Sequence, residues 1–321
     1  MLKGLNARAM TLITWGIEHS EELGILAEKH PTGATLIDLG IKARGGLAAG
    51  RLMTEVCLGG LGKTSITTSS YEDVAVPSIH VETDFPAVAT LGAQFAGWQI
   101  KTSDYFAMGS GPARAIALKP KELFQKIAYS EKSENAVLVL EADRYPTEEA
   151  IKYIAQECET TPSNVYVLVA PTSSMAGVVQ ISGRIVESGI HRLTELGFDP
   201  KKILYGCGYA PISPIHPNAA KAMGRTNDAI SYGGATFYSV DSDDDAKLKE
   251  LTSRAPSSAS KDYGRPFYEV FKAANFDFYK IDSGIFAPAT FAVTNVKTGV
   301  THTAGKINPT LLKQTMQLTP A

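Results

Sequence analysis

The chain has 321 residues, of which 44% are hydrophobic and 20% charged, so it can bury a large core and is long enough for about two domains. Lys and Arg number 31 and Asp and Glu 33, which gives a net charge of −2. This balance argues against a nucleic-acid-binding protein, because such proteins usually carry a basic excess. It also argues against the charge-dense surface of a hyperthermophile protein.

Cysteine and hydropathy patterns indicate the compartment. Cys57, Cys158 and Cys207 lie far apart and form no CxxC pair, which argues against a disulfide framework or a thiolate zinc site. The apolar stretch over residues 9–17 is too short to span a membrane, and no signal-peptide cleavage site follows it. We therefore expect a soluble protein of the reducing cytoplasm.

In chain order, the N-terminal part alternates helical and extended segments. Helices are predicted for the first segment, for residues 21–29, 48–58 and 87–96, and strands for 34–40, 65–69 and 74–83. His30-Pro31-Thr32-Gly33 breaks the chain between the second helix and the first strand. The glycine-rich residues 104–112 are predicted to form a loop.

The middle and C-terminal parts give clearer patterns. Apolar runs at 136–140 and 164–170 flank a predicted helix at 147–158, which is typical of a βαβ unit. A polar turn over 171–177 leads into a long helix that ends near residue 196. After it we expect a short strand at 203–205, a helix opened by the acidic run 241–245, a polar loop at 253–261, and strands and turns over 276–300.

These elements predict an α/β fold that is neither a standard Rossmann fold nor a P-loop fold. We expect an N-terminal α/β lobe over residues 1–130 and a C-terminal α/β lobe over 131–321, which would carry the long helix after residue 171. No composition shift or flexible linker marks the boundary between the two lobes, and the lobes could be interleaved.

One glycine motif suggests nucleotide binding. Gly59-Gly60-Leu61-Gly62-Lys63-Thr64 ends like a phosphate-binding P-loop, but Cys57 stands where that pattern requires its first glycine, and no clear strand precedes it. We favour a glycine turn packed closely on its neighbours. A nucleotide-binding protein is the alternative.

Other polar motifs have both a functional and a structural interpretation. Gly109-Ser110-Gly111-Pro112 with Arg114 could bind an anion through exposed backbone N–H groups, or form a plain turn. His80, Glu82 and Asp84 alternate along a predicted strand, which favours a solvated strand face over a metal site. The clusters 224–228 and 279–282 could bind a substrate, but capping and turns explain most such clusters. The six histidines form no close ligand pair, so no metal is expected.

Arg184 and Glu187 lie three residues apart on the long predicted helix, so their side chains share one helix face. A surface ion pair is the simplest interpretation of this spacing. The helix, however, follows a strand and a polar turn, and ligands of α/β folds gather at the carboxyl ends of strands. The pair is therefore a candidate site.

Five long strings carry a family resemblance. They are ARGGLAAGRLMTEVCLGGLG (43–62), DYFAMGSGPARAIALKPKE (104–122), NVYVLVAPTSSMAG (164–177), AMGRTNDAISYGG (222–234) and DFYKIDSGIFAPA (277–289). In order and together, they resemble the methenyltetrahydromethanopterin cyclohydrolases, from about residue 34 to about residue 313.

The resemblance implies an enzyme of one-carbon metabolism that uses no metal and no redox cofactor. It would interconvert methenyltetrahydromethanopterin and water with the 5-formyl compound, as a homotrimer whose subunits have two α/β lobes enclosing a pocket. The family's catalytic glutamate and its companion arginine fall on Glu187 and Arg184, inside QISGRIVES (180–188). Candidate substrate contacts by the same resemblance are Ser110, Arg114, Arg225, Asn227 and Lys280.

The chemistry of the substrate is consistent with this assignment. The methenyl carbon lies between two nitrogens of an amidinium-like cation, so it is already electrophilic and needs no covalent nucleophile. Accordingly, the sequence has no GxSxG motif. A single carboxylate can take a proton from the attacking water and then protonate the leaving nitrogen. We hypothesise that Glu187 does both and that Arg184 holds Glu187 or the water in place. A non-catalytic pterin- or phosphate-binding protein is the other alternative.

Overall fold

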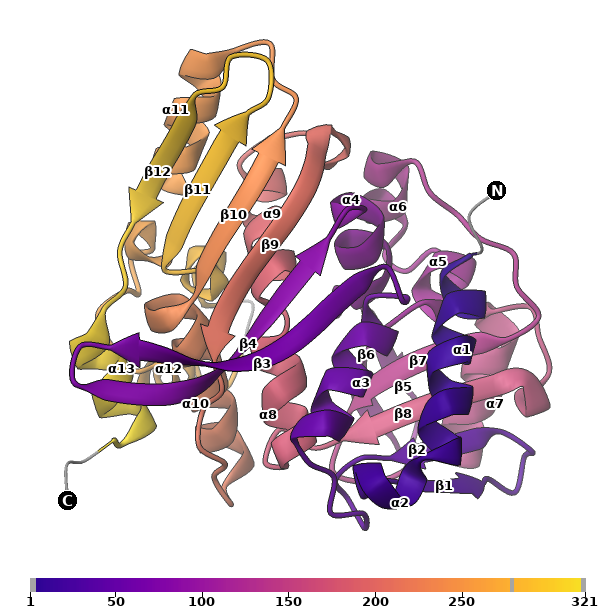
Figure 1. The fold of residues 1–321 in the computed structure, drawn as a ribbon. Helices are drawn as coiled ribbons and strands as arrows, with labels where there is room; N and C mark the ends of the chain where they lie inside the picture. The colour runs from indigo at the N-terminus through magenta and orange to yellow at the C-terminus, as the bar shows by residue number, and fades with distance from the viewer. Residues whose placement is uncertain (1–3, 278–279, 319–321) are drawn as a thin grey trace. The chain divides into compact units, whose positions relative to one another are not determined.

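The computed structural model describes residues 4–277 and 280–318, and the chain divides into two compact units. Unit 1 comprises residues 1–63 and 87–180, and unit 2 comprises residues 64–86 and 181–321. Each unit combines helices with a six-stranded sheet, which confirms the predicted α/β class (Figure 1). The division differs from the predicted boundary at residue 130 in two places. Residues 131–180 complete the sheet of unit 1, and the segment 64–86 joins the sheet of unit 2.

The sheet of unit 1 has the strand order β1-β2-β8-β7-β6-β5. Its strands are β1 (Leu26–Lys29), β2 (Thr35–Asp38), β5 (Trp98–Lys101), β6 (Phe106–Ser110), β7 (Ala136–Glu141) and β8 (Val165–Ala170). The central strands β2, β8 and β7 run parallel, and the outer pairs are antiparallel. The predicted βαβ unit is thus confirmed as β7, α7 and β8.

Helices cover both faces of this sheet. They are α1 (Leu5–Glu18), α2 (Ser20–Leu23), α3 (Leu47–Cys57), α4 (Pro86–Ala89), the π-helix η1 (Thr90–Gln94), α5 (Ala113–Ala117), α6 (Lys121–Ile127), α7 (Glu148–Glu157), the 3-10 turn η2 (Pro162–Asn164) and α8 (Met175–Ser182). Leu138 and Leu140 of β7 pack toward α7, whereas Val137 and Val139 pack toward α1 and α3. Burial on both faces explains the continuous apolar run of this strand.

Two predictions for unit 1 are wrong. The helix expected over 21–29 ends at Leu23, because Gly24 adopts a left-handed conformation (φ 62°) and the next residues pair with β2. The loop expected over 104–112 contains the strand β6, which pairs with both β5 and β7. In both places, sheet pairing overrides the local pattern.

The sheet of unit 2 has the strand order β12-β11-β10-β9-β4-β3. Its strands are β3 (Gly62–Tyr71), β4 (Val74–Thr83), β9 (Ile203–Pro211), β10 (Ala235–Val240), β11 (Thr290–Asn295) and β12 (Thr301–Gly305). The strands β10 and β11 run parallel, and the pairs β12–β11, β10–β9 and β9–β4 are antiparallel. The strands predicted at 65–69 and 74–83 are confirmed, and β9 is longer than the predicted 203–205.

Helices of unit 2 pack on one face of its sheet (Figure 1). The helices of this unit are α9 (Ile185–Glu195), α10 (Ala219–Gly233), α11 (Asp245–Arg254), α12 (Phe267–Ala273) and α13 (Pro309–Met316), with 3-10 turns η3 (Pro200–Lys202), η4 (Ser257–Ala259) and η6 (Ser283–Phe286). The acidic run opens α11 as predicted, since Asp244 accepts the N–H of Lys247 at 2.8 Å.

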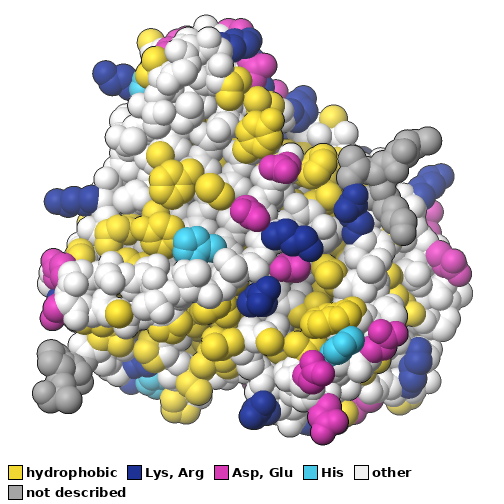
Figure 2. Space-filling view, in the orientation of Figure 1, with side chains coloured by type: hydrophobic (Ala, Val, Ile, Leu, Met, Phe, Trp, Pro, Cys, Tyr) yellow, Lys and Arg dark blue, Asp and Glu magenta, His cyan; other side chains and the backbone are white. Residues whose placement is uncertain are grey.

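The other face of this sheet is more exposed. Tyr205 of β9 and Phe237 of β10 are 54% and 48% exposed, and hydrophobic side chains are visible over this part of the molecule in Figure 2. Among the described residues, no helix combines the length and the apolar character that crossing a membrane requires.

Candidate active site

Glu187 is a buried carboxylate in the first turn of α9. Glu187 is only 6% exposed, and the residues Ile185, Val186 and Ile190 of the same helix are buried as well. The positive end of the helix dipole favours a negative charge at this position, while burial opposes it. A carboxylate held in this way can accept and return a proton, which is the requirement for general acid–base catalysis.

Arg184 lies at a break in the predicted long helix, which is a difference from the sequence analysis. The helix divides into α8 and α9, and Arg184 (φ −82°, ψ 4°) is the residue that precedes α9. Its N–H donates to the carbonyl of Ile181 at 3.0 Å, and its carbonyl accepts the N–H and the hydroxyl of Ser188 at 2.8 and 2.9 Å. Arg184 and Glu187 therefore flank the start of α9, one helical turn apart.

The break also changes the argument for the site. The strand β8 and the polar turn after it belong to unit 1, whereas Glu187 belongs to unit 2. The strand-to-helix junction invoked for Glu187 thus leads into α8 and not directly into α9. What distinguishes Glu187 is its own burial at a helix start, and not its distance from a strand end.

Ser110 and Arg114 are buried inside unit 1. The guanidinium of Arg114 donates to the backbone carbonyls of Leu91, Ala93 and Lys119 at 2.8–3.1 Å, and the residue has no exposed surface. The hydroxyl of Ser110, 2% exposed, lies 3.2 Å from the sulfur of Cys57. These contacts give both residues a packing role in unit 1, and their contact with a substrate stays a prediction.

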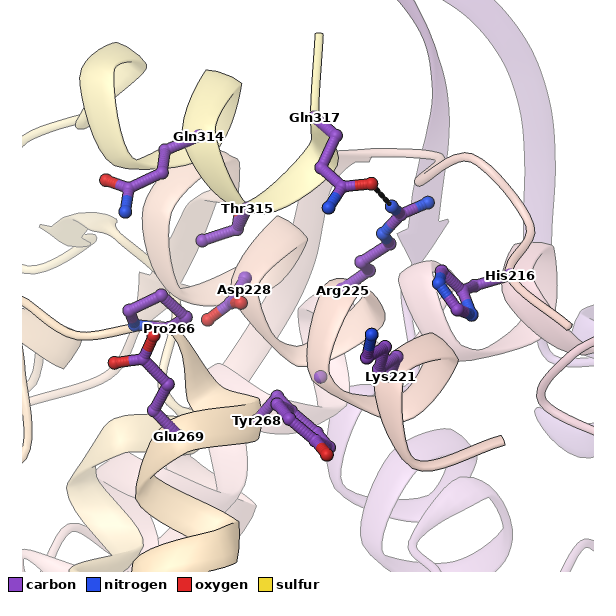
Figure 3. A pocket seen from close by; sticks show the side chains of 11 residues that line it. His216, Lys221, Arg225, Asp228, Pro266, Tyr268, Glu269, Gln314, Thr315 and Gln317 are labelled. Carbon is purple, nitrogen blue, oxygen red and sulfur yellow. Dashed lines mark hydrogen bonds between the residues drawn. The ribbon is translucent and has the colours of Figure 1, made fainter. Parts of the chain in front are cut away.

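Arg225 lines a cavity of about 310 Å³ in unit 2 (Figure 3). The side chain projects from α10 and donates to the Oε1 atom of Gln317. The cavity is lined by basic, acidic and amide side chains together with an aromatic ring, from His216, Lys221, Gly224, Arg225, Asp228, Pro266, Tyr268, Glu269, Gln314, Thr315 and Gln317. Such a mixture can attract an anionic group through its cations and hold it by hydrogen bonds.

Asp228 is a buried acidic residue that lines this cavity. Its carboxyl group is 3% exposed and accepts the backbone N–H of Phe267 at 2.9 Å. Burial raises the pKa of Asp228 to about 8, and the negative charge of Glu269 contributes to the increase. At neutral pH the group is therefore mostly a neutral carboxylic acid, which can donate as well as accept a hydrogen bond.

The remaining predicted contacts are not gathered in this cavity. The side-chain amide of Asn227 donates to the carbonyl of Met223 at 2.9 Å, within α10. Lys280 is exposed, and its ammonium group lies 3.4 Å from the carboxylate of Asp277. Of the predicted cluster 279–282, Tyr279 lies outside the described residues.

The glycine motif at 59–64 forms a turn from a helix into a strand. The helix α3 ends at Cys57 and β3 begins at Gly62, which is the reverse of the strand–loop–helix order of a P-loop. Gly59 and Gly60 have φ values of 64° and 68°, and a Cβ atom on Gly59 would overlap the side chain of Leu5. The interpretation as a closely packed glycine turn is confirmed.

The alternating residues at the end of β4, together with Asp84 just after it, form an exposed face, as predicted. His80, Glu82 and Asp84 are all exposed, and the ring of His80 stacks on Tyr209 with 5.3 Å between ring centroids. Within residues 4–277 and 280–318, no three His, Cys, Asp or Glu side chains are grouped so that they could hold a metal ion.

Sequence reasoning missed two buried groups of unit 2. Asp228 belongs to the polar cluster 224–228, which ordinary turns and caps also explain, and Tyr238 belongs to none of the motifs. Tyr238 lies on β10, next to the first turn of α9, and its hydroxyl donates to the carbonyl of Val186 at 2.8 Å. The aromatic and β-branched residues of ATFYSV (235–240) are a signal that could have identified this strand.

Comparisons with known proteins cover nearly the whole chain. The family described as Cyclohydrolase (MCH) matches residues 4–316. The methenyltetrahydromethanopterin cyclohydrolase of Methanothermobacter marburgensis is 48% identical over 317 residues, which cover 98% of this chain and 99% of that protein. The protein of the same name from Methanocaldococcus jannaschii is 47% identical over 315 residues, covering 97% and 98%. The chain therefore belongs to the cyclohydrolase family of enzymes.

Proposed function

We propose that this protein catalyses the reversible hydrolysis of methenyltetrahydromethanopterin to 5-formyltetrahydromethanopterin. The name and near-complete coverage of its relatives support the reaction, and the buried carboxylate at the start of α9 supports the mechanism. The burial of Glu187 beside a helix N-terminus is the observation that supports its proposed role as the acid–base group. A non-catalytic binding protein would need no such group.

The proposed reaction starts with the attack of water on the methenyl carbon. As the oxygen–carbon bond forms, Glu187 takes one proton from the water, and the cationic amidinium becomes a neutral adduct. Glu187 then returns the proton to the nitrogen that loses the carbon, and that carbon–nitrogen bond breaks. The hydroxyl proton of the adduct leaves to solvent as the formyl C=O forms, so the overall reaction consumes one water and releases one proton.

Arg184 is proposed to position the reacting groups. It stands one helical turn before Glu187, at a break that places it outside the regular helix. Its guanidinium is a fixed positive charge with several N–H donors, suited to orient a carboxylate or a water molecule. Arg225, Asn227 and Lys280 stay predictions as substrate contacts. Ser110 and Arg114, whose polar groups are buried inside unit 1, also stay predictions as substrate contacts.

The tetrahydromethanopterin tail gives Arg225 a defined role in this proposal. An acidic or phosphorylated tail needs cationic partners, and Arg225 shares its cavity with Lys221 and His216. The homotrimer, the cytoplasmic location and catalysis without a metal or a redox cofactor stay predictions from the resemblance and from the cysteine pattern.

The decisive experiment is the substitution Glu187→Gln, assayed by loss of the methenyl chromophore. Glutamine keeps the shape and removes the base, so turnover should fall by at least about 10²-fold. Glu195→Gln is the matched control: it lies on the same helix, is exposed, and pairs with Arg192 at 3.4 Å on the surface. It should leave turnover unchanged.

Binding separates the two functional classes. If the protein is an enzyme, Glu187→Gln should still bind the methenyl compound, which can be followed as a ligand-dependent rise in melting temperature. Near-normal turnover of this variant would remove Glu187 from the mechanism. Binding without turnover in the unaltered protein would instead favour a carrier.

A further inference from the structure

Tyr238 connects the sheet of unit 2 to the first turn of α9. It is a buried residue of β10, 2% exposed, and its hydroxyl donates to the backbone carbonyl of Val186 at 2.8 Å. Val186 directly precedes Glu187. Because a carbonyl oxygen has two lone pairs, it can accept this hydroxyl in addition to a helix hydrogen bond. The bond therefore fixes the backbone next to the carboxylate without interrupting α9.

Glycines allow this close approach. A Cβ atom on Gly189 would overlap the hydroxyl oxygen of Tyr238, so only glycine leaves room for the bond. On β9, a Cβ atom on Gly206 would lie 3.1 Å from Val186, and one on Gly208 would lie 3.3 Å from Ile185. The first turn of α9 thus rests directly on β9 and β10, close to the sheet backbone.

Electrostatics keep the Tyr238 hydroxyl in its donor form. Burial raises the pKa of Tyr238 well above its ordinary value, and the negative charge of Glu187 raises it further. The phenol therefore stays protonated across the working pH range.

We propose that Tyr238 is a positioning residue that holds Glu187 in its reactive place by fixing the first turn of α9. The inference rests on the proposed function, since it assigns Tyr238 a role only through Glu187. Acid–base catalysis depends on a carboxylate held within hydrogen-bond reach of the water, and small displacements are costly. Tyr238 would act without touching the substrate.

The test is Tyr238→Phe, which removes only the hydroxyl. We expect kcat to fall by about 5- to 20-fold while KM stays within about twofold, because the substrate contacts are retained. The acidic limb of the pH profile of kcat/KM should also shift, because the carboxylate changes its surroundings. A residue that only stabilised the fold would not move this limb.

Tyr232→Phe is the matched control. Tyr232 is also buried, and its hydroxyl donates to the carbonyl of Arg265 at 2.7 Å, away from α9. Both variants lose one buried hydroxyl-to-carbonyl bond and should lose similar thermal stability, but Tyr232→Phe should keep its kcat and pH profile. Equal kinetics in the two variants would overturn the inference.

Gly189→Ala provides a second route if Tyr238→Phe fails to fold. The added methyl group displaces the Tyr238 hydroxyl, so kcat should fall by a similar factor. In the double variant the two losses should not multiply, because both remove the same contact. Fully multiplicative losses would contradict the inference. An inactive Glu187→Gln with a normal Tyr238→Phe refutes this inference alone, whereas an active Glu187→Gln removes Glu187 from the proposed mechanism.

Discussion

The two units use their arginines in different ways. In unit 1, Arg114 is fully buried, donates to three backbone carbonyls and lies between the rings of Phe95 and Phe124, with 5.3–5.4 Å to each ring centroid. In unit 2, Arg225 is half-buried, lines a cavity and hydrogen-bonds the exposed side chain of Gln317. The comparison shows that an arginine in a glycine-rich motif can be part of the core.

The two units also differ in the pKa of a buried aspartate. Asp38 of unit 1 has no exposed surface and accepts the N–H groups of four successive residues, 40–43, at 2.6–3.0 Å. Burial acts to raise the pKa of Asp38, but these four bonds outweigh it and lower the pKa below its ordinary value. Asp228 of unit 2 accepts one such bond, so burial prevails. The number of donors decides whether a buried acid is charged.

The largest expected effect in this comparison is on stability. Arg114→Ala should lower the free energy of unfolding by about 3 kcal/mol or more, because it leaves three buried carbonyls without a donor and opens a cavity between two rings. Chemical denaturation measures this loss. An unchanged denaturation midpoint with a raised KM would instead return Arg114 to the substrate site and break the contrast between the units.

A smaller effect concerns the pH dependence of stability. In the pH range between the ordinary Asp value of 3.8 and about 8, folded Asp228 holds a proton that the unfolded chain releases. The contribution of Asp228 to the free energy of unfolding is therefore complete below pH 3.8. It is lost, at about 1.4 kcal/mol per pH unit, as the pH rises toward about 8. Asp228→Asn keeps an acceptor for Phe267 and should remove this loss.

The measurement is the free energy of unfolding of Asp228→Asn and of the unaltered protein at about pH 6 and about pH 7.5. Between these two pH values, the difference in unfolding free energy between the proteins should change by about 2 kcal/mol in favour of the variant. Asp38→Asn is the control of opposite sign: since the pKa of Asp38 is lowered, its stabilisation is present at neutral pH and is lost as the pH falls. Parallel pH profiles for Asp228→Asn and the unaltered protein would show that Asp228 is ionised.

The smallest expected effect is that of Arg225→Ala. Because Arg225 is half-buried and its side chain hydrogen-bonds the exposed Gln317, the unfolding free energy should change by no more than about 0.5 kcal/mol. If the cavity holds an anionic part of the substrate, KM should rise by about 3- to 10-fold with little change in kcat. Steady-state kinetics with the methenyl compound decide this. A loss of stability as large as that of Arg114→Ala would mean that both arginines serve the fold.

The sequence predicts the fold best where each strand is buried on two faces. The apolar runs that become β7 and β8 and the helix between them follow from hydrophobic patterning alone. The strand β6 does not follow from this patterning, because its glycine and serine residues are typical of a loop. The helix α10 does not either, because tertiary contacts stabilise it. The membership of residues 64–86 in unit 2 depends on pairing with β9, which no local pattern reveals.

The candidate site is predicted in part. Arg184 and Glu187 can be predicted from their spacing and from the resemblance. The break between α8 and α9 cannot, and it leaves Arg184 just outside the regular helix while Glu187 lies in the first turn of α9. The burial of Arg114 could not be predicted, since it depends on carbonyls 21 and 23 residues away in the chain. The contact of Tyr238 could not be predicted for a similar reason, since its hydrogen-bond partner Val186 is distant in sequence.

The hairpin of β3 and β4 has a consequence for synthesis on the ribosome. It leaves the exit tunnel early, yet its partner strand β9 follows only after the whole segment 87–180 has been made. Until then β4 exposes an unpaired edge, which is prone to pair with other chains. Nascent chains that pause before β9 should therefore be the species that most need a chaperone, and truncation after residue 180 should yield aggregates.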